Sequence, residues 1–236
     1  MILVLQFRTD QSGWHEVKCI YDSVNKSYND FLFMNVMSPF VTTEMILDKL
    51  KVAKSVILGG LGEGGYEDVD PHKIKNLQYI LEKIAPVVNI LKDNSIPTLG
   101  ICFGHQVLAD LLGGEVIAEP SMAEAGVAEI ILTPVGKKDP LLQSLPKSFY
   151  GIVSHKSSVI RLPEEASLLA YSDRCPIQGF RYQSNIYGFQ LHPELNMQDY
   201  HSRMQLYPEY MKHNLKTNDN QEILAQQILI NFINKL

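Results

Sequence analysis

The sequence predicts an α/β fold with an open, mostly parallel central sheet flanked by helices, and an additional antiparallel strand region in its second half. In the first half, short apolar runs alternate with amphipathic segments of helix length, which is typical of a parallel sheet covered on both faces. After the Gly113-Gly114 pair, closely spaced strand patterns and turns replace this alternation. With 236 residues, 45% of them hydrophobic, we expect 1–236 to form a single domain with one large core.

Two helices are predicted between the strands of the first half. Thr43 has the chemistry of an N-cap and precedes apolar side chains at helical spacing. A longer amphipathic pattern covers 73–92, where Pro86 predicts a kink. The buried strands expected around these helices are 2–7, 31–36, 55–58 and the run IPTLGIC at 96–102.

The second half is expected to be rich in short strands. A short helix is predicted over 139–145, and two more helices over 198–212 and 222–236. The expected strands are 127–132, 149–154, 167–172, 177–182 and 186–191.

Charge and cysteine usage exclude several classes of protein. The net charge of −5 comes from 21 basic and 26 acidic residues without a basic block, which argues against nucleic acid as a partner. The apolar N-terminal run is shorter than a signal peptide and lacks its basic start, and no apolar span reaches 18 residues, so we expect a soluble cytoplasmic protein without membrane contact. The three cysteines are widely separated and show no CxxC spacing, which predicts neither disulfides nor a metal site.

One cysteine, Cys102, lies between two glycines where a buried strand becomes a helix, in the stretch GICFGHQ. Such a sharp turn strains the residue at the bend, and Gly100 and Gly104 relieve the crowding. The sulfur would lie near the helix N-terminus, whose partial positive charge stabilises a thiolate. The N–H of Phe103 would face a bound carbonyl oxygen, as one donor of an oxyanion hole. Cys102 is therefore a candidate nucleophile, and a small buried hydrophobic side chain is the alternative.

A base for this nucleophile is offered by the stretch YGFQLHPEL, which contains His192 and Glu194. If the segment is extended, side-chain alternation sends both residues to the same side. Glu194 would then orient and charge His192, and His192 would exchange a proton with Cys102. A surface His and Glu at a strand end is the alternative, but the presence of both motifs favours catalysis.

A glycine-rich stretch, SVILGGLGEGGYED, follows the third expected strand. It lacks the Lys-Ser/Thr pair of a phosphate-binding loop, and the segment beyond it is acidic. Gly59 and Gly60, directly after the strand, could turn an amide toward Cys102 and supply the second oxyanion donor. The later glycines are explained equally well as a flexible turn.

Together these residues resemble the class I glutamine amidotransferases, a family with a Cys-His-Glu triad on an open, flavodoxin-like α/β sheet. The family's G-x-C-x-G-x-Q motif is matched by 100–106 and its H-P-E motif by 192–194, in the same order along the chain. The resemblance extends from Ile2 to the final ILINFINKL. It is strongest to stand-alone members similar to the glutaminase domain of GMP synthase, notably over 139–194.

The resemblance implies roles for six residues. They are Cys102 as nucleophile, His192 as base and then acid, Glu194 as its orienting partner, Gly60 and Phe103 as oxyanion donors, and Gln106 as a substrate-binding residue.

The sequence departs from the family's pattern at two places. Leu61 stands where the glycine loop usually continues with Pro, and 156–158 reads KSS where Gly or Met and an acidic residue are common. His155 matches a His near the family's pocket but outside the triad, and His105 is assigned no chemical role.

The implied reaction is thiolate attack on the side-chain amide of L-glutamine, release of ammonia and hydrolysis of the γ-glutamyl thioester, without a metal or cofactor. No P-loop or S-G-G-x-D-S signature for ATP is present, so a separate synthetase subunit is the expected acceptor of the ammonia. One alternative is a γ-glutamyl amide or peptide hydrolase that uses the same triad. A second is a catalytically silent regulatory or binding homologue. Cys19 and Cys175 lack the glycine-flanked turn and are expected to be structural.

Overall fold

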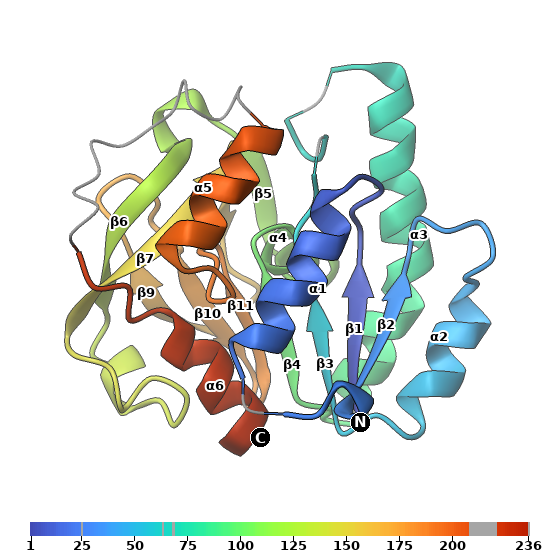
Figure 1. Cartoon of the computed structure of the whole chain (residues 1–236), viewed down its shortest axis with the longest axis horizontal. Coiled ribbons are helices and arrows are strands. Elements are labelled where there is room, and N and C mark those ends of the chain that lie inside the picture. Colours follow the sequence, from blue (N-terminus) through green and yellow to red (C-terminus); the bar gives the residue numbers. More distant parts are fainter. Residues whose placement is uncertain (25, 63, 68, 208–220, 236) are drawn as a thin grey trace.

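A nine-stranded sheet runs through the described part of the chain, in the order β2-β1-β3-β4-β11-β10-β9-β6-β7 (Figure 1). The computed structural model describes residues 1–24, 26–62, 64–67, 69–207 and 221–235. Five neighbouring strands are parallel. They are β1 (Ile2–Gln6), β2 (Phe31–Asn35), β3 (Ser55–Leu58), β4 (Thr98–Ile101) and β11 (Ile186–Phe189).

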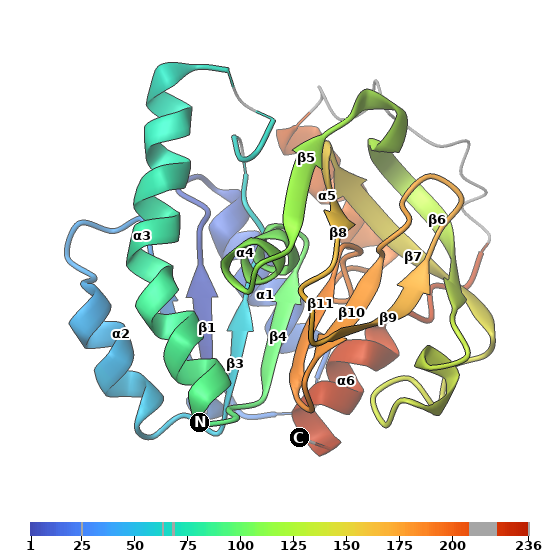
Figure 2. The same ribbon diagram turned by 180° about the vertical axis from the view of Figure 1, so that it is seen from behind.

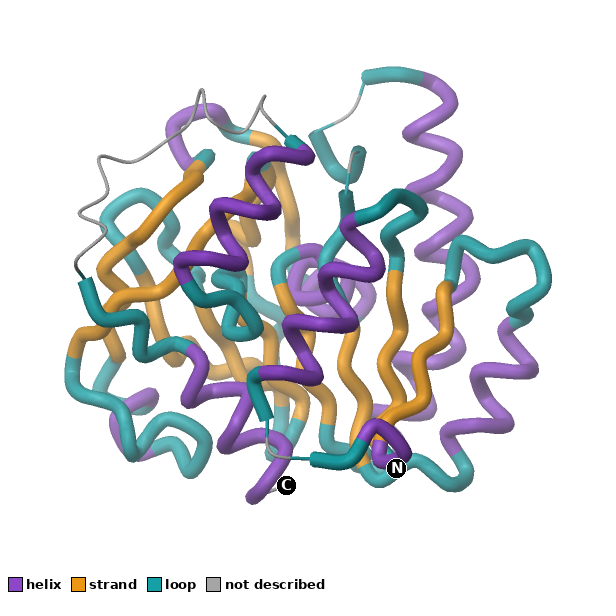
Figure 3. Tube along the Cα trace, in the orientation of Figure 1, coloured by secondary structure: helices purple, strands orange, loops and turns teal. Residues whose placement is uncertain are grey.

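The other four strands of this sheet are antiparallel to their neighbours, which confirms the predicted fold class. They are β6 (Glu124–Leu132), β7 (Ser148–His155), β9 (Ala166–Tyr171) and β10 (Gly179–Tyr182). A separate antiparallel pair is formed by β5 (Glu115–Ala118) and β8 (Ser157–Arg161). Figure 3 shows the strand-rich second half beside the half in which helices and strands alternate.

Helices cover both faces of the parallel strands (Figures 1 and 2). On one face lie α1 (Ser12–Asp22) and α6 (Gln226–Lys235), and α5 (Met197–Leu206) packs beside α1. The opposite face carries α2 (Thr43–Leu50), α3 (Pro71–Asp93) and α4 (Phe103–Leu111). Short 3-10 turns occur at Tyr28–Asp30, Pro120–Met122 and Gly136–Lys138.

The alternation of side chains in the buried strands divides the core between the two faces. In β1, Ile2 and Val4 pack with α1 and α6, whereas Leu3 and Leu5 pack with α2, α3 and α4. The whole strand is buried, as expected for a parallel strand covered on both sides. Its carboxyl end therefore meets the ends of β3, β4 and β11 at one protected edge of the sheet.

Several predicted elements differ from the structure. The predicted helix at 139–145 is wrong, because this segment forms hydrogen-bonded turns on Asp139 and not a helix. The last helix begins at Gln226, later than predicted, because Ile223 pairs in a β-bridge with Tyr150. The helix predicted over 198–212 ends at Leu206, and 208–212 lies outside the described residues.

Some of the other elements were predicted, with small differences in their bounds, and three were not predicted. α3 continues through Pro86 to Asp93. The strands expected at 177–182 and 186–191 are present but shorter, as β10 and β11. α1, β5 and β8 were not predicted from the sequence. Within the described residues, no helix is long and apolar enough to cross a membrane.

Candidate active site

Cys102 forms the junction between β4 and α4 in a strained backbone conformation, with φ 51° and ψ −101°. Its N–H donates to the carbonyl of Phe189 at the end of β11 (2.8 Å). The tight turn needs both flanking glycines: a Cβ on Gly100 would clash with the carbonyl of Gly104, and one on Gly104 with the carbonyl of Leu58 in β3. The predicted bend at Cys102 is present, and a non-glycine residue at positive φ is a costly conformation that occurs mainly at functional sites.

His192 and Glu194 follow β11 and lie beside this turn. Nδ1 of His192 is 2.8 Å from Oε1 of Glu194, and both side chains are buried. The strand alternation used to predict this pairing is wrong, because β11 ends at Phe189 and 192–195 forms a turn in which the N–H of Leu195 donates to the carbonyl of His192 (3.3 Å). The turn still brings the two side chains together.

Electrostatics favour a charged His192–Glu194 pair. Burial opposes protonation of His192, but the neighbouring Glu194 and Cys102 outweigh it and raise the pKa of the imidazole. Burial also opposes ionisation of Glu194, but the charge and hydrogen bond of His192 and the charge of Arg203 lower the pKa of the carboxyl. The imidazole therefore has a strong carboxylate partner on Nδ1, which leaves Nε2 for Cys102.

The Cys102 sulfur has two further polar neighbours. Sγ lies 3.6 Å from the carbonyl oxygen of Ser154 in β7, and Nε2 of Gln190 donates to Sγ over 3.6 Å. The amide of Gln190 also accepts from Nε2 of Gln106 (3.1 Å), which donates to the carbonyl of Ser157 as well (2.8 Å). Gln106 is thus buried and linked to Cys102 through Gln190.

The N–H groups of the two predicted oxyanion donors differ in their hydrogen bonding. Phe103 is the first residue of α4, so its N–H has no acceptor within the helix. The N–H of Gly60 instead donates to Oε1 of Glu16 (2.8 Å), a buried carboxylate on α1 that also pairs with Arg8 (Nε–Oε1 3.2 Å). The Gly60 N–H can therefore donate to a substrate oxygen only after its hydrogen bond to Glu16 is broken.

The cavity beside Cys102 is small, about 20 Å³, which is room for about one water molecule. It is lined by both segments in which the sequence departs from the family pattern, through Leu61 and Lys156 among others. Across it, Oγ of Ser157 donates to Oε2 of Glu67 (2.8 Å). A larger cavity, about 520 Å³, lies between α2 and α3, and none of the predicted site residues lines it.

Two further histidines and the other two cysteines lie outside the contact between His192 and Glu194, and all four are buried. His155 pairs with Glu124 (Nε2–Oε2 3.2 Å), and His105 packs on Phe180 with its pKa lowered to about 3 by burial. Burial also raises the pKa of Cys19 and of Cys175 to about 12, so neither is a ready thiolate.

The expectation that the reaction needs no metal stays a prediction. Among the described residues, potential ligand atoms converge in two groups, although their residues are far apart in sequence. They are His15, Cys19 and Asp199, and Glu124, His155 and Cys175.

Sequence reasoning missed Glu16 and Arg203, which contact the predicted residues. Nη1 of Arg203 donates to Oε1 of Glu194 (3.0 Å). A local signal for Arg203 exists, because it lies nine residues after Glu194 in a helix that the HPE turn leads into. No local signal marks Glu16, which comes from the N-terminal helix.

Comparison with known proteins identifies relatives over most of the chain. The model of the family described as glutamine amidotransferase class-I matches residues 30–206. A glutamine-hydrolyzing GMP synthase subunit of Methanocaldococcus jannaschii is 30% identical over 178 residues, 75% of this chain and 85% of that protein. The protein of the same name from Methanosphaera stadtmanae is 38% identical over 116 residues, which span 49% of this chain and only 60% of that relative.

Two other similarities bear on the range of the family. Gamma-glutamyl peptidase 5 of Arabidopsis thaliana is 37% identical over 116 residues, 48% of this chain and 46% of that protein. The crystal structure of a glutamine amidotransferase from Thermotoga maritima superimposes with a TM-score of 0.72 at 19% identity, over 100% of this chain and 97% of that one. At that identity the superposition supports the fold alone.

Proposed function

Because this chain belongs to the class-I glutamine amidotransferase family, we propose that it hydrolyses the side-chain amide of L-glutamine through a thioester on Cys102. The observation that carries this proposal is the buried His192–Glu194 pair beside a cysteine held at φ 51° at the start of a helix. These are the parts that a cysteine nucleophile requires: a strained position at the edge of the sheet, a base and an orienting carboxylate.

In the first half of the reaction, the Cys102 sulfur forms a bond to the amide carbon of glutamine while His192 holds the thiol proton. The oxygen becomes an oxyanion, for which Phe103 N–H is one donor and Gly60 N–H the second once Glu16 releases it. His192 then protonates the nitrogen, the C–N bond breaks and ammonia leaves.

In the second half, His192 takes a proton from water, which attacks the γ-glutamyl thioester. The C–S bond breaks, glutamate leaves and the Cys102 thiol is restored. Gln106 lines the cavity beside Cys102, where we propose that it helps to hold the substrate, and its side chain is fixed by bonds to Gln190 and to the Ser157 carbonyl. The substrate needs far more room than the cavity of about 20 Å³ beside Cys102, so the segment that carries Glu67 must move for it to enter.

We further propose that the ammonia passes to a separate synthetase subunit, because the archaeal relatives are named as one subunit of a GMP synthase. We also propose that this takes place in the cytoplasm. The peptidase relative supports a second candidate, hydrolysis of γ-glutamyl peptides or amines by the same residues. The two differ only in the leaving group. Turnover of glutamine compared with γ-glutamyl amines and peptides separates them, and a strong preference for the peptides would exclude the amidotransferase function.

Covalent labelling with a glutamine-like chloroketone tests the nucleophile directly. We expect one adduct per chain on Cys102, lost in Cys102→Ala and retained in the matched variant Cys175→Ala, because Cys175 is buried with a pKa raised to about 12. Peptide mass spectrometry locates the adduct. Absence of labelling together with absence of hydrolysis of every γ-glutamyl compound would instead support the silent regulatory or binding homologue.

A further inference from the structure

Arg203, on α5, contacts the carboxylate of the predicted triad. Its side chain is 2% exposed, and Nη1 donates to Oε1 of Glu194 at 3.0 Å. The same oxygen accepts the hydrogen bond of His192 Nδ1 at 2.8 Å. Two cationic groups therefore share one oxygen of a fully buried carboxylate.

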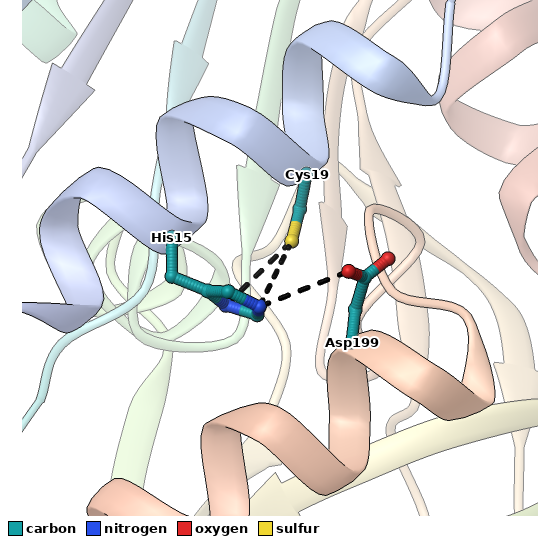
Figure 4. Close-up of side chains that lie close together, drawn as sticks. All are labelled: His15, Cys19 and Asp199. Atoms are coloured by element: carbon teal, nitrogen blue, oxygen red, sulfur yellow. Dashed lines mark hydrogen bonds and ion pairs between the residues drawn. The ribbon is translucent and has the colours of Figure 1, made fainter.

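Arg203 is itself held by α1. Its Nε and Nη2 lie 3.1 and 3.0 Å from Nδ1 of His15, and Nη2 lies 3.9 Å from Sγ of Cys19. On the other side of the ring, Nε2 of His15 lies 3.8 Å from Oδ1 of Asp199. Figure 4 shows His15 and Cys19 projecting from α1 toward Asp199 on the neighbouring helix.

The His15–Cys19–Asp199 group is suited to hold Arg203 and not a metal ion. A cation bound there would lie beside the guanidinium, which already uses His15 Nδ1, so the two positive charges would repel each other. Burial, followed by the charge of Arg203, lowers the pKa of His15, and Asp199 opposes this only in part. At neutral pH the ring is therefore uncharged, with Nδ1 as acceptor and its proton on Nε2 toward Asp199.

The charges of the buried group show what Arg203 contributes. With His192 protonated and Glu194 ionised, Arg203 leaves one net positive charge, which a thiolate on Cys102 neutralises. Without Arg203 the same group is already neutral with Cys102 as a thiol, and a thiolate would leave an uncompensated negative charge in a buried site. Arg203 thus favours the ionised nucleophile.

We propose that Arg203 is a positioning residue of the site: it fixes the Glu194 carboxylate against His192 and supplies the charge that a Cys102 thiolate balances, and His15 holds Arg203 in place. The proposal rests on Cys102 and His192 acting together, as in the proposed function, but not on the identity of the substrate.

Other charged groups near Cys102 do not substitute for Arg203. Arg8 interacts with both Cys102 and Glu194, but Glu16 neutralises it across 3.2 Å. Glu67 and Lys156, which line the cavity, carry opposite charges. All four are retained in the variants below.

The test is the pH dependence of iodoacetamide alkylation at Cys102, followed by peptide mass spectrometry, which needs no substrate. In Arg203→Met we expect the midpoint of the rate profile to move up by about one pH unit, because Arg203 is linked to Cys102 through Glu194 and His192, and the loss of a buried positive charge disfavours the thiolate. Arg203→Lys keeps the positive charge, so its midpoint should lie between those of the wild-type protein and Arg203→Met. The matched variant Arg161→Met, at a side chain 60% exposed, should leave the profile unchanged.

Turnover supplies a second readout if a γ-glutamyl substrate is found: kcat of Arg203→Met should fall at least about tenfold while KM changes less than about twofold, since the lost interaction acts on the transition state. If Arg203→Met does not fold, His15→Leu keeps the arginine but removes its acceptor, and it should shift the alkylation profile in the same direction. A wild-type alkylation profile in folded Arg203→Met, or in His15→Leu where Arg203→Met does not fold, would overturn the proposal. If the wild-type protein is alkylated at Cys102 and the variants shift its profile as expected, but no γ-glutamyl compound is hydrolysed, only the proposed function is contradicted.

Discussion

Arg8 and Glu16 form a buried ion pair that also fixes the state of the glycine loop. Their side chains are 3% and 1% exposed, and the carboxylate accepts from the N–H of Gly60. The close approach is possible because residue 60 has no side chain, since a Cβ there would lie 2.7 Å from the guanidinium. The pair thus links the end of β1, α1 and the loop after β3 at the edge of the sheet where Cys102 lies.

A double-mutant cycle on this pair should show strong coupling. Arg8→Met and Glu16→Leu should each lower the free energy of unfolding by about 3–5 kcal/mol, because each leaves the other charge buried without its partner. The double variant should be more stable than the sum of the two losses implies. Urea unfolding of the four proteins measures this, and additive losses would mean that the pair does not interact.

At the residue scale, the sequence predicted the parts of the site that are adjacent in the chain. Cys102 and Phe103 are neighbours, and His192 and Glu194 are two apart, so short motifs reveal them. Glu16 and Arg203 were not predicted to belong to the site, because charged side chains are expected at the surface. Only long-range contacts make their burial favourable.

At the scale of elements, α1 shows why hydrophobic periodicity has limits. Its buried positions are Ser12, Glu16, Cys19 and Ile20, which follow helical spacing, but two of the four are polar. A search for apolar residues at that spacing therefore finds no helix, although the helix packs α5 and holds the site. α4 was found because its buried face includes Val107 and Leu108 and its start carries the glycine motif.

The packing of α4 on β3 depends on Gly104. In Gly104→Ala the new Cβ would clash with the Leu58 carbonyl, and the start of α4 would have to move, at a cost of about 1–3 kcal/mol in stability. Labelling of Cys102 should slow as well. The matched variant Gly13→Ala, where a Cβ meets only ordinary contacts at 3.4 Å, should label at the wild-type rate; equal labelling of both variants would contradict the argument.

At the scale of the whole molecule, the triad pair makes stability depend on pH. The pKa of Glu194 is lowered on folding, so its contribution is present above its ordinary value of 4.5 and is lost as the pH falls through the folded value. The pKa of His192 is raised, so its contribution is complete below its ordinary value of 6.5 and is lost as the pH rises through the folded value. The pair therefore stabilises the fold most between pH 4.5 and 6.5.

This dependence is measurable by urea unfolding at about pH 5.5 and about pH 9.5. Wild type should lose more free energy of unfolding between these values than His192→Gln, which has no titrating imidazole at this position. The difference between the two proteins cancels the other groups that titrate in the interval. Equal losses would show that His192 is not charged in the folded protein.

The global architecture was predictable because the two halves have different hydrophobic patterns, and the pairing order was not. β11 lies next to β4 although they are separated by more than 80 residues and six other strands. Such a partner is set by long-range packing, which leaves no local sequence signal. The separate β5–β8 pair was missed for the same reason.

Because β4 and β11 are adjacent, main-chain contacts and cavity-lining side chains have separate effects on the site. Ile101 is in register with Phe189, and the N–H of Cys102 donates to the Phe189 carbonyl, so main-chain hydrogen bonds set the spacing between Cys102 and the segment that leads to His192. Side chains that line the cavity beside Cys102, such as Glu67 and Ser157, do not contribute to that spacing. Substitutions there can change which γ-glutamyl compound is admitted while the reacting atoms keep their separation.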